Sequence, residues 1–114
     1  MIYFHGGGCC LYPPIYDFIC ARYAAENDLV VFLPDYRLAP ETPFPGGAND
    51  CYSTVKWLIK NFQEFGVDRS MICIGGESGG GNLVLNVTRM LTERNEQNYI
   101  KLVLCSTPMI SPHE

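Results

Sequence analysis

Residues 76–80 place a serine among glycines in a pattern that suits a nucleophile. Gly76-Glu77-Ser78-Gly79-Gly80 fits G-x-S-x-G, and it stands between an apolar run and a stretch with helical periodicity. A serine at such a strand-to-helix turn has a strained backbone and a hydroxyl that projects above the sheet, while small neighbours let a substrate approach. The helix N-terminus adds a dipole that favours developing negative charge. The pattern predicts that Ser78 is a nucleophile, with a glycine-rich turn of no catalytic role as the alternative.

A second glycine motif, His5-Gly6-Gly7-Gly8, follows the first apolar run. This is the H-G-G-G pattern of a loop whose backbone N–H groups stabilise the oxyanion of acyl transfer. Removal of one such donor typically costs about 2.7–4 kcal/mol of transition-state stabilisation. His5 is not expected to be the base, because hydrolases with these motifs carry nucleophile, acid and histidine in that order. Taken alone, this motif has a flexible glycine turn as its alternative.

Four continuous apolar runs predict strands that are buried on both faces of a parallel sheet. They cover residues 1–4, 29–33, 71–74 and 102–105. Three stretches with helical period lie between them: one with Ile15, Phe18, Ile19 and Tyr23 on one face, one over 51–65 that Gly66 ends, and one with Leu83, Val84, Val87, Met90 and Leu91. With right-handed crossovers, the order β-α-β-α-β-α-β predicts a doubly wound, mostly parallel α/β sheet of about four strands and three helices. Ser78 is expected at the carboxyl end of the third strand.

Composition and motif spacing argue against several function classes. The 114 residues suffice for one small domain and carry a formal net charge of -4 without a basic run, so no nucleic-acid partner is expected. No apolar stretch reaches the ~18 residues of a membrane span. The glycine motifs fit neither G-x-x-x-x-G-K-[ST] nor G-x-G-x-x-G, which argues against a nucleotide site. The six cysteines and two histidines lack metal-ligand spacing, so neither a metal nor another cofactor is expected.

The cysteines are expected to be free thiols, mostly buried or half-buried. They form no C-x-x-C pair, and Cys73 and Cys105 lie inside apolar runs, where free cysteine behaves as a small hydrophobic residue. Free thiols favour a reducing compartment such as the cytoplasm, while the lumen of an organelle stays an open alternative. The sequence therefore leaves the localisation undecided.

Taken together, the motifs resemble the hormone-sensitive-lipase group of the α/β-hydrolase fold, which includes arylacetamide-deacetylase-like and bacterial carboxylesterases. The resemblance is carried in chain order by His5-Gly6-Gly7-Gly8, Tyr36-Arg37-Leu38-Ala39-Pro40-Glu41, Phe44-Pro45 with Asp50, and Gly76-Glu77-Ser78-Gly79-Gly80-Gly81-Asn82-Leu83. Residues 1–114 are thus expected to be a partial α/β-hydrolase domain, from the oxyanion loop through the strand after the nucleophile helix. Relatives often carry aspartate at position 77 and alanine at position 79, and neither difference removes the nucleophile or a backbone donor.

The resemblance implies a serine carboxylesterase or lipase-like hydrolase that acts on a small-molecule ester without a cofactor. Ser78 would form an acyl-serine intermediate, and the backbone N–H groups of Gly7, Gly8 and Gly79 would form the oxyanion hole. The segment 36–41 would be structural. The alternative is a non-catalytic small-molecule receptor on the same fold, as the plant gibberellin receptors are within this group.

The sequence offers Ser78 no evident base and no carboxylate to orient one. Every aspartate precedes Ser78, and Glu93 lies fifteen residues beyond it along the predicted helix, hence ~22 Å away at about 1.5 Å per residue. His113 is interpreted as a loop histidine. We therefore expect the chain to be a fragment that is inactive by itself, with its acid and histidine elsewhere in a parent polypeptide.

Overall fold

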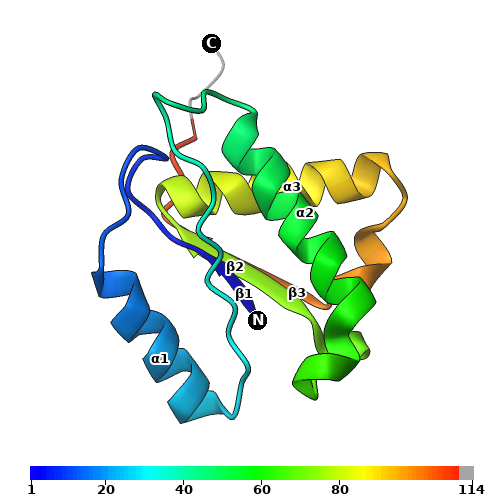
Figure 1. Cartoon of the computed structure of the whole chain (residues 1–114). Helices are drawn as coiled ribbons and strands as arrows, with labels where there is room; N and C mark the ends of the chain where they lie inside the picture. The colour runs from blue at the N-terminus through cyan, green and yellow to red at the C-terminus, as the bar shows by residue number, and fades with distance from the viewer. Residues whose placement is uncertain (111–114) are drawn as a thin grey trace.

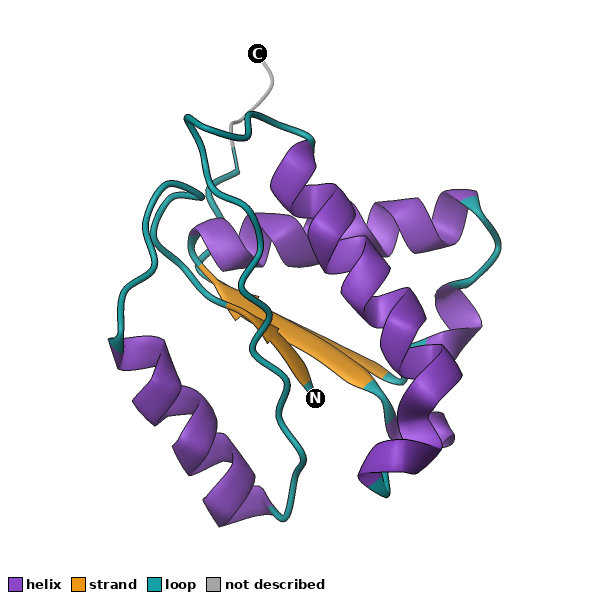
Figure 2. Ribbon diagram, viewed as in Figure 1, coloured by secondary structure: helices purple, strands orange, loops and turns teal. Residues whose placement is uncertain are grey.

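A parallel sheet lies between helices on both of its faces (Figure 1; Figure 2). The computed structural model describes residues 1–110. Its strands pair in the order β1-β2-β3, with bounds β1 (Ile2–Phe4), β2 (Cys73–Glu77) and β3 (Leu102–Ser106). Ile2 lies opposite Ile74, and Cys73 lies opposite Leu102. The doubly wound parallel α/β fold that the sequence predicted is confirmed.

The apolar run at 29–33 does not form the full strand that the sequence predicted. It contributes one isolated parallel bridge, between Phe32 and Ile2. Phe32 N–H donates to the Met1 carbonyl at 2.8 Å, and Tyr3 N–H donates to the Phe32 carbonyl at 2.8 Å. The next position that would donate towards β1 is Pro34, directly after the run, which has no N–H, so the ladder ends there.

Three helices carry the chain across the two faces of the sheet. Their bounds are α1 (Ile15–Asn27), α2 (Gly46–Asn61) and α3 (Gly79–Glu93), and short 3-10 turns cover Phe62–Phe65, Arg69–Met71 and Gln97–Tyr99. Ile2 and Phe4 of β1 belong to the core that α2 and α3 cover. Tyr3, which points to the opposite face, packs with Tyr16 of α1. In residues 1–110, no helix combines the length and apolar character that crossing a bilayer requires.

The helical stripes agree with the sequence in α3 and differ from it in α1. All five predicted positions of α3 are buried, which confirms that stripe. In α1 the buried residues are Tyr16 and Cys20, and the predicted Ile19 and Tyr23 are half-buried and pack against the same cluster. The predicted Ile15 and Phe18 are 57% and 72% exposed. This part of the prediction is wrong because α1 packs around the aromatic ring of Tyr3, which turns a different side of the helix inward.

The last predicted strand forms but is not buried on both faces as expected. Leu102, Val103 and Leu104 of β3 are 56%, 40% and 42% exposed. The strand is the outer one of the described sheet, and its free edge has no neighbour among residues 1–110. Periodicity alone predicts burial for such a run, whereas the actual exposure depends on what lies beside it.

Candidate active site

Ser78 occupies the junction between β2, which ends at Glu77, and α3, which begins at Gly79. Its φ of 54° and ψ of −121° are rarely adopted by a non-glycine residue, and such a conformation costs of order 1–3 kcal/mol. Backbone bonds hold it there: its N–H donates to the Ser106 carbonyl at 3.0 Å, and its carbonyl accepts from the Asn82 N–H at 3.1 Å. The residue is half-buried and its side chain does not cap α3. Ser78 therefore has the strained strand-to-helix geometry that the sequence predicted, at the carboxyl end of the third predicted strand.

Two glycines around Ser78 have no room for a side chain. A Cβ on Gly80 would lie 2.0 Å from the carbonyl oxygen of Phe4, and a Cβ on Gly76 would lie 2.6 Å from the carbonyl oxygen of Gly80. Backbone packs directly on backbone here, which glycine alone permits. The first turn of α3 is thereby held against the carboxyl end of β1, where the other glycine motif starts.

The loop that follows β1 comes next to the residue after Ser78. A Cβ on Gly79 would lie 3.0 Å from the backbone nitrogens of both Gly8 and Cys9. Gly7 and Gly8 have φ of 108° and 63°, and the Gly7 carbonyl accepts two N–H groups of the following turn at 3.1 Å each. Among the backbone bonds recorded for residues 1–110, none uses the N–H of Gly7 or Gly8. Together with the N-terminal N–H groups of α3, these donors form a surface that can bind an anionic oxygen.

His5 is fully buried beneath this loop. It is therefore not free to act as a base for Ser78. The residue has 0% exposure, and its ring stacks on Tyr36 with the centroids 4.2 Å apart and the planes at 12°. Its Nδ1 lies 2.7 Å from the Gly6 carbonyl oxygen, so Nδ1–H is assigned as the donor, and Nε2 is buried without a partner in the described residues. Burial lowers the pKa of His5, although the bond to Gly6 and the charge of Asp35 oppose the effect. His5 is therefore a neutral ring that supports the loop.

Tyr36 supports the glycine loop, in keeping with the structural role expected for the segment 36–41. Its hydroxyl donates to the His5 carbonyl at 2.7 Å, and it is 2% exposed. The neighbouring Arg37 donates two guanidinium bonds to the Asp50 carboxylate, at 2.8 Å and 2.7 Å, which lowers the pKa of Asp50. These bonds connect the segment after Pro34 to the glycine loop and to α2. No local spacing in the sequence predicts the contact between Tyr36 and His5.

The end of β3 and the segment after it contact Ser78 and the first turn of α3, which the sequence motifs did not indicate. The Asn82 side chain donates to the Met109 carbonyl at 3.0 Å and accepts from the Met109 N–H at 2.7 Å. The Ser106 carbonyl accepts the Ser78 N–H, as described above. The usable signal was topological, because the carboxyl ends of neighbouring parallel strands meet at one edge of a sheet.

A general base for Ser78 is not found among residues 1–110. The histidine in this range, His5, is sealed beneath the glycine loop. Glu93 ends α3 and pairs with Arg89 at 2.6 Å, far along the helix from Ser78, as expected. His113, the loop histidine of the sequence analysis, lies outside the described residues. The roles of Ser78 as nucleophile and of Gly7, Gly8 and Gly79 as oxyanion donors stay predictions.

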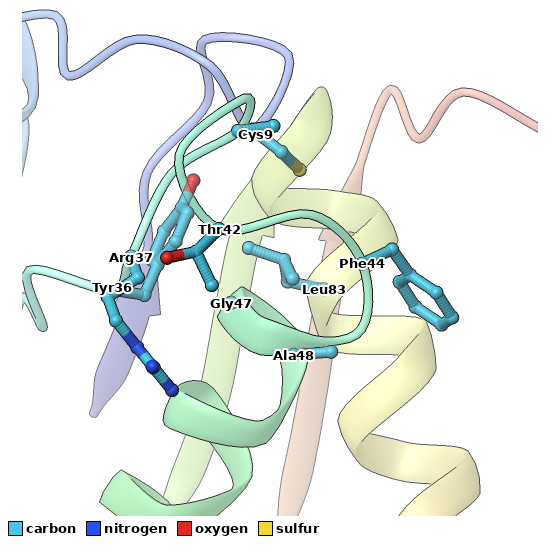
Figure 3. Close-up of a pocket in the computed structure, with 9 residues that line it drawn as sticks. Cys9, Tyr36, Arg37, Thr42, Phe44, Gly47, Ala48 and Leu83 are labelled. Carbon is cyan, nitrogen blue, oxygen red and sulfur yellow. The ribbon is translucent and has the colours of Figure 1, made fainter.

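A pocket of about 150 Å³ opens beside the glycine loop (Figure 3). Cys9 lines it at the end next to the loop, and Leu83 of α3 and Ala48 of α2 line its sides. The other lining residues come from the segment between β1 and α2 and from the start of α2: Tyr36, Arg37, Ala39, Thr42, Phe44 and Gly47. Ser78 itself is not a lining residue, so the pocket adjoins the candidate nucleophile and does not contain it.

All six cysteines are free in the structure. Three are buried (Cys20, Cys51 and Cys73), Cys9 and Cys105 are half-buried, and Cys10 is exposed. The predicted burial or half-burial thus holds for five of the six, and Cys10 is the exception. Burial raises the pKa of the half-buried Cys9 thiol and raises that of Cys20 to about 11.

The fold and this arrangement at the carboxyl edge of the sheet define an α/β-hydrolase. A sequence model of the alpha/beta hydrolase fold matches residues 1–114, and the chain belongs to this family. The relatives are of the hormone-sensitive-lipase group that the motifs resembled. The chain is 34% identical to arylacetamide deacetylase of Oryctolagus cuniculus over 98% of its own length, and 38% identical to carboxylesterase NlhH of Mycobacterium tuberculosis over 73%.

Solved structures agree with the sequence relatives. The esterase of Pyrobaculum calidifontis is 37% identical over 98% of the chain, with a TM-score of 0.91. Esterase Est22 is 34% identical over 99% of the chain, also with a TM-score of 0.91. The chain spans 29% of the rabbit deacetylase, 26% of the mycobacterial carboxylesterase and 38% of the Pyrobaculum esterase. It thus covers about a third of the length of these relatives.

Proposed function

We propose that this chain supplies the nucleophile and the oxyanion donors of a serine carboxylic ester hydrolase. The observation that carries the proposal is the pairing of the strained Ser78 with the glycine loop, whose Gly8 nitrogen lies 3.0 Å from the position of a Gly79 Cβ. The esterase names of the relatives support the same reaction class. Other chemistries of the fold lack a comparable observation in this chain.

In the proposed reaction, the Ser78 hydroxyl oxygen attacks the ester carbonyl carbon while a base removes the hydroxyl proton. The carbonyl oxygen becomes an oxyanion, and the N–H groups of Gly7, Gly8 and Gly79 donate to it. Collapse of the tetrahedral intermediate breaks the bond to the alcohol oxygen, which takes up the proton, and leaves an acyl-serine. Water then attacks the acyl group by the same route, which releases the acid and restores Ser78. His5 and Tyr36 take no proton in this scheme, since both are committed to holding the loop.

We assign neither the base nor its orienting carboxylate to residues 1–110. For that reason we expect Ser78 of the 114-residue chain to be no more reactive than an ordinary serine. A non-catalytic receptor is the alternative function, since such a protein could keep the same serine and glycine loop without a base. The two functions differ in whether a complete protein turns over an ester.

The test is a chimera in which this chain replaces the matching part of the Pyrobaculum calidifontis esterase. Fluorophosphonate labelling and hydrolysis of 4-nitrophenyl acetate are measured on the chimera and on the 114-residue chain. We expect the chimera to be labelled at Ser78 and to turn over the ester, whereas the short chain is labelled weakly. Ser78→Ala should lower kcat by ~10⁶-fold, whereas Ser53→Ala, at an exposed position of α2, should leave it unchanged. A folded chimera that is neither labelled at Ser78 nor able to hydrolyse the ester would overturn the proposed role of Ser78.

A further inference from the structure

The pocket next to Cys9 has no role in the proposed reaction, although it adjoins the candidate active site. Its volume is about 150 Å³, and in another protein an apolar cavity of about 150 Å³ binds benzene. Small molecules bind in such concave sites when most of the lining is apolar. Here five of the nine lining residues are aliphatic or aromatic: Tyr36, Ala39, Phe44, Ala48 and Leu83. A compact hydrocarbon group of benzene size therefore matches the space.

The charges around the pocket favour a neutral ligand over an ionic one. Arg37 is the lining residue with a formal charge, and its guanidinium is committed to two bonds with the Asp50 carboxylate. Burial raises the pKa of Cys9, so its thiol stays neutral at pH 7. The Tyr36 hydroxyl is likewise committed, since it donates to the His5 carbonyl. One hydroxyl, that of Thr42, is left among the lining side chains to contact a ligand, so a neutral and largely apolar group is favoured.

The pocket touches both halves of the candidate active site. Cys9 directly follows Gly8, and its carbonyl accepts the Ala39 N–H at 2.9 Å, so loop and pocket wall are one connected piece. Its sulfur lies 3.8 Å from the Gly79 carbonyl oxygen, beside the residue that follows Ser78. Leu83 stands on the helix that begins at Gly79. A group held here would lie beside the glycine loop and the first turns of α3, and it would not be the reacting carbonyl itself, because Ser78 does not line the pocket.

We propose that this pocket is the subsite for a neutral apolar substituent of about six carbon atoms on the ester that Ser78 attacks. The assignment rests on the proposed function. The same hydrocarbon chemistry has two sources, a substituent of the ester or a free small molecule, and the two parts of the experiment below separate them.

The first part measures binding on the 114-residue chain itself. Benzene is titrated into the ¹⁵N-labelled chain, and backbone amide shifts are followed by NMR. We expect saturable shifts at Cys9, Ala39, Ala48 and Leu83. Cys9→Met, which places a longer flexible side chain at the pocket wall, should abolish them, and Cys10→Met at the exposed neighbouring position should not.

The second part measures the ester preference of the chimera described above. The ratios of kcat/KM are compared for methyl hexanoate over methyl acetate and for hexyl acetate over methyl acetate. Cys9→Met should lower one of these ratios by at least ~10-fold, while Cys10→Met leaves both unchanged. Should Cys9→Met fail to fold, as judged by circular dichroism, Thr42→Leu is the second pocket-filling variant with the same expected result.

The outcomes distinguish this assignment from the proposed function. Absence of saturable benzene shifts at the lining residues of the folded chain would overturn the pocket as a binding site, whatever Ser78 does. Benzene binding together with unchanged ester preferences would show a site for a free hydrocarbon and would overturn the subsite. An unlabelled Ser78 in a chimera whose chain still binds benzene would overturn the reaction and not the pocket.

Discussion

Protonation of His5 should destabilise the protein as the pH falls from 7 to 5. The ring is fully buried between Tyr36 and Tyr12, and its Nε2 has no hydrogen-bond partner in the described residues. A proton on Nε2 would place an unpaired charge in this environment. Burial accordingly lowers the pKa of His5 from its ordinary value of 6.5.

The sign follows from which state takes up the proton first. In the unfolded chain the imidazole binds a proton near pH 6.5, whereas the folded ring resists protonation to a lower pH, so acidification favours unfolding. If the folded ring stays neutral down to pH 5, the free energy of unfolding falls by about 1.9 kcal/mol between pH 7 and pH 5, which is the upper limit for one histidine. Asp50, Asp68 and Glu96 have lowered pKa values starting from 3.8 and 4.5, so their losses come at lower pH.

The assay is urea unfolding at pH 7, 6 and 5, followed by the fluorescence of the single Trp57, whose ring lies 5.4 Å from that of Phe65. The comparison protein is His5→Phe, which keeps an aromatic ring against Tyr36 and cannot titrate. His113 remains in both proteins, so its own titration cancels. We expect the unfolding free energy of the natural sequence to fall more steeply with acidification. Equal pH slopes in the two proteins would refute the assignment of His5 as a buried neutral ring.

Three further predictions concern packing, thiols and the loop anchor. Gly80→Ala should lower the unfolding free energy by about 3 kcal/mol or more, because its Cβ would lie 2.0 Å from a carbonyl oxygen of β1; Gly75→Ala, whose nearest atom would be 3.5 Å away, should cost far less in the same urea assay. Ellman titration should count six thiols in the denatured, unreduced protein, and in the folded protein the exposed Cys10 should react first and the fully buried Cys51 last; a count lowered by disulfides would contradict this. Asp50→Asn should lower the melting temperature at pH 7 and lose this effect as the pH falls below 3.8, because the pKa of Asp50 is lowered in the folded state; a pH-independent difference would contradict the ion-pair explanation.

Local patterns in the sequence were sufficient for the part of the site that consists of contiguous residues. The run into Ser78 and the stripe from Leu83 to Leu91 predicted β2, the turn and α3, since strand, tight turn and amphipathic helix are each specified by neighbouring residues. The glycines of the second motif likewise predicted a loop with free N–H groups. The family followed from the order of these motifs along the chain, which a single sequence contains in full.

The tertiary structure decided what depends on residues that are distant in sequence. Phe32 forms a single bridge because Pro34 has no N–H to donate to β1. Helix α1 turns Tyr16 inward because Tyr16 packs against Tyr3 of the sheet. Strand β3 is exposed because it is the outer strand. Local spacing did not predict the contact between Tyr36 and His5, which are 31 residues apart. It also did not predict that Leu83 lines the pocket. Contacts of this kind depend on how whole helices and strands pack against one another. Periodicity in the sequence shows only that an element has an apolar face, and not what that face contacts.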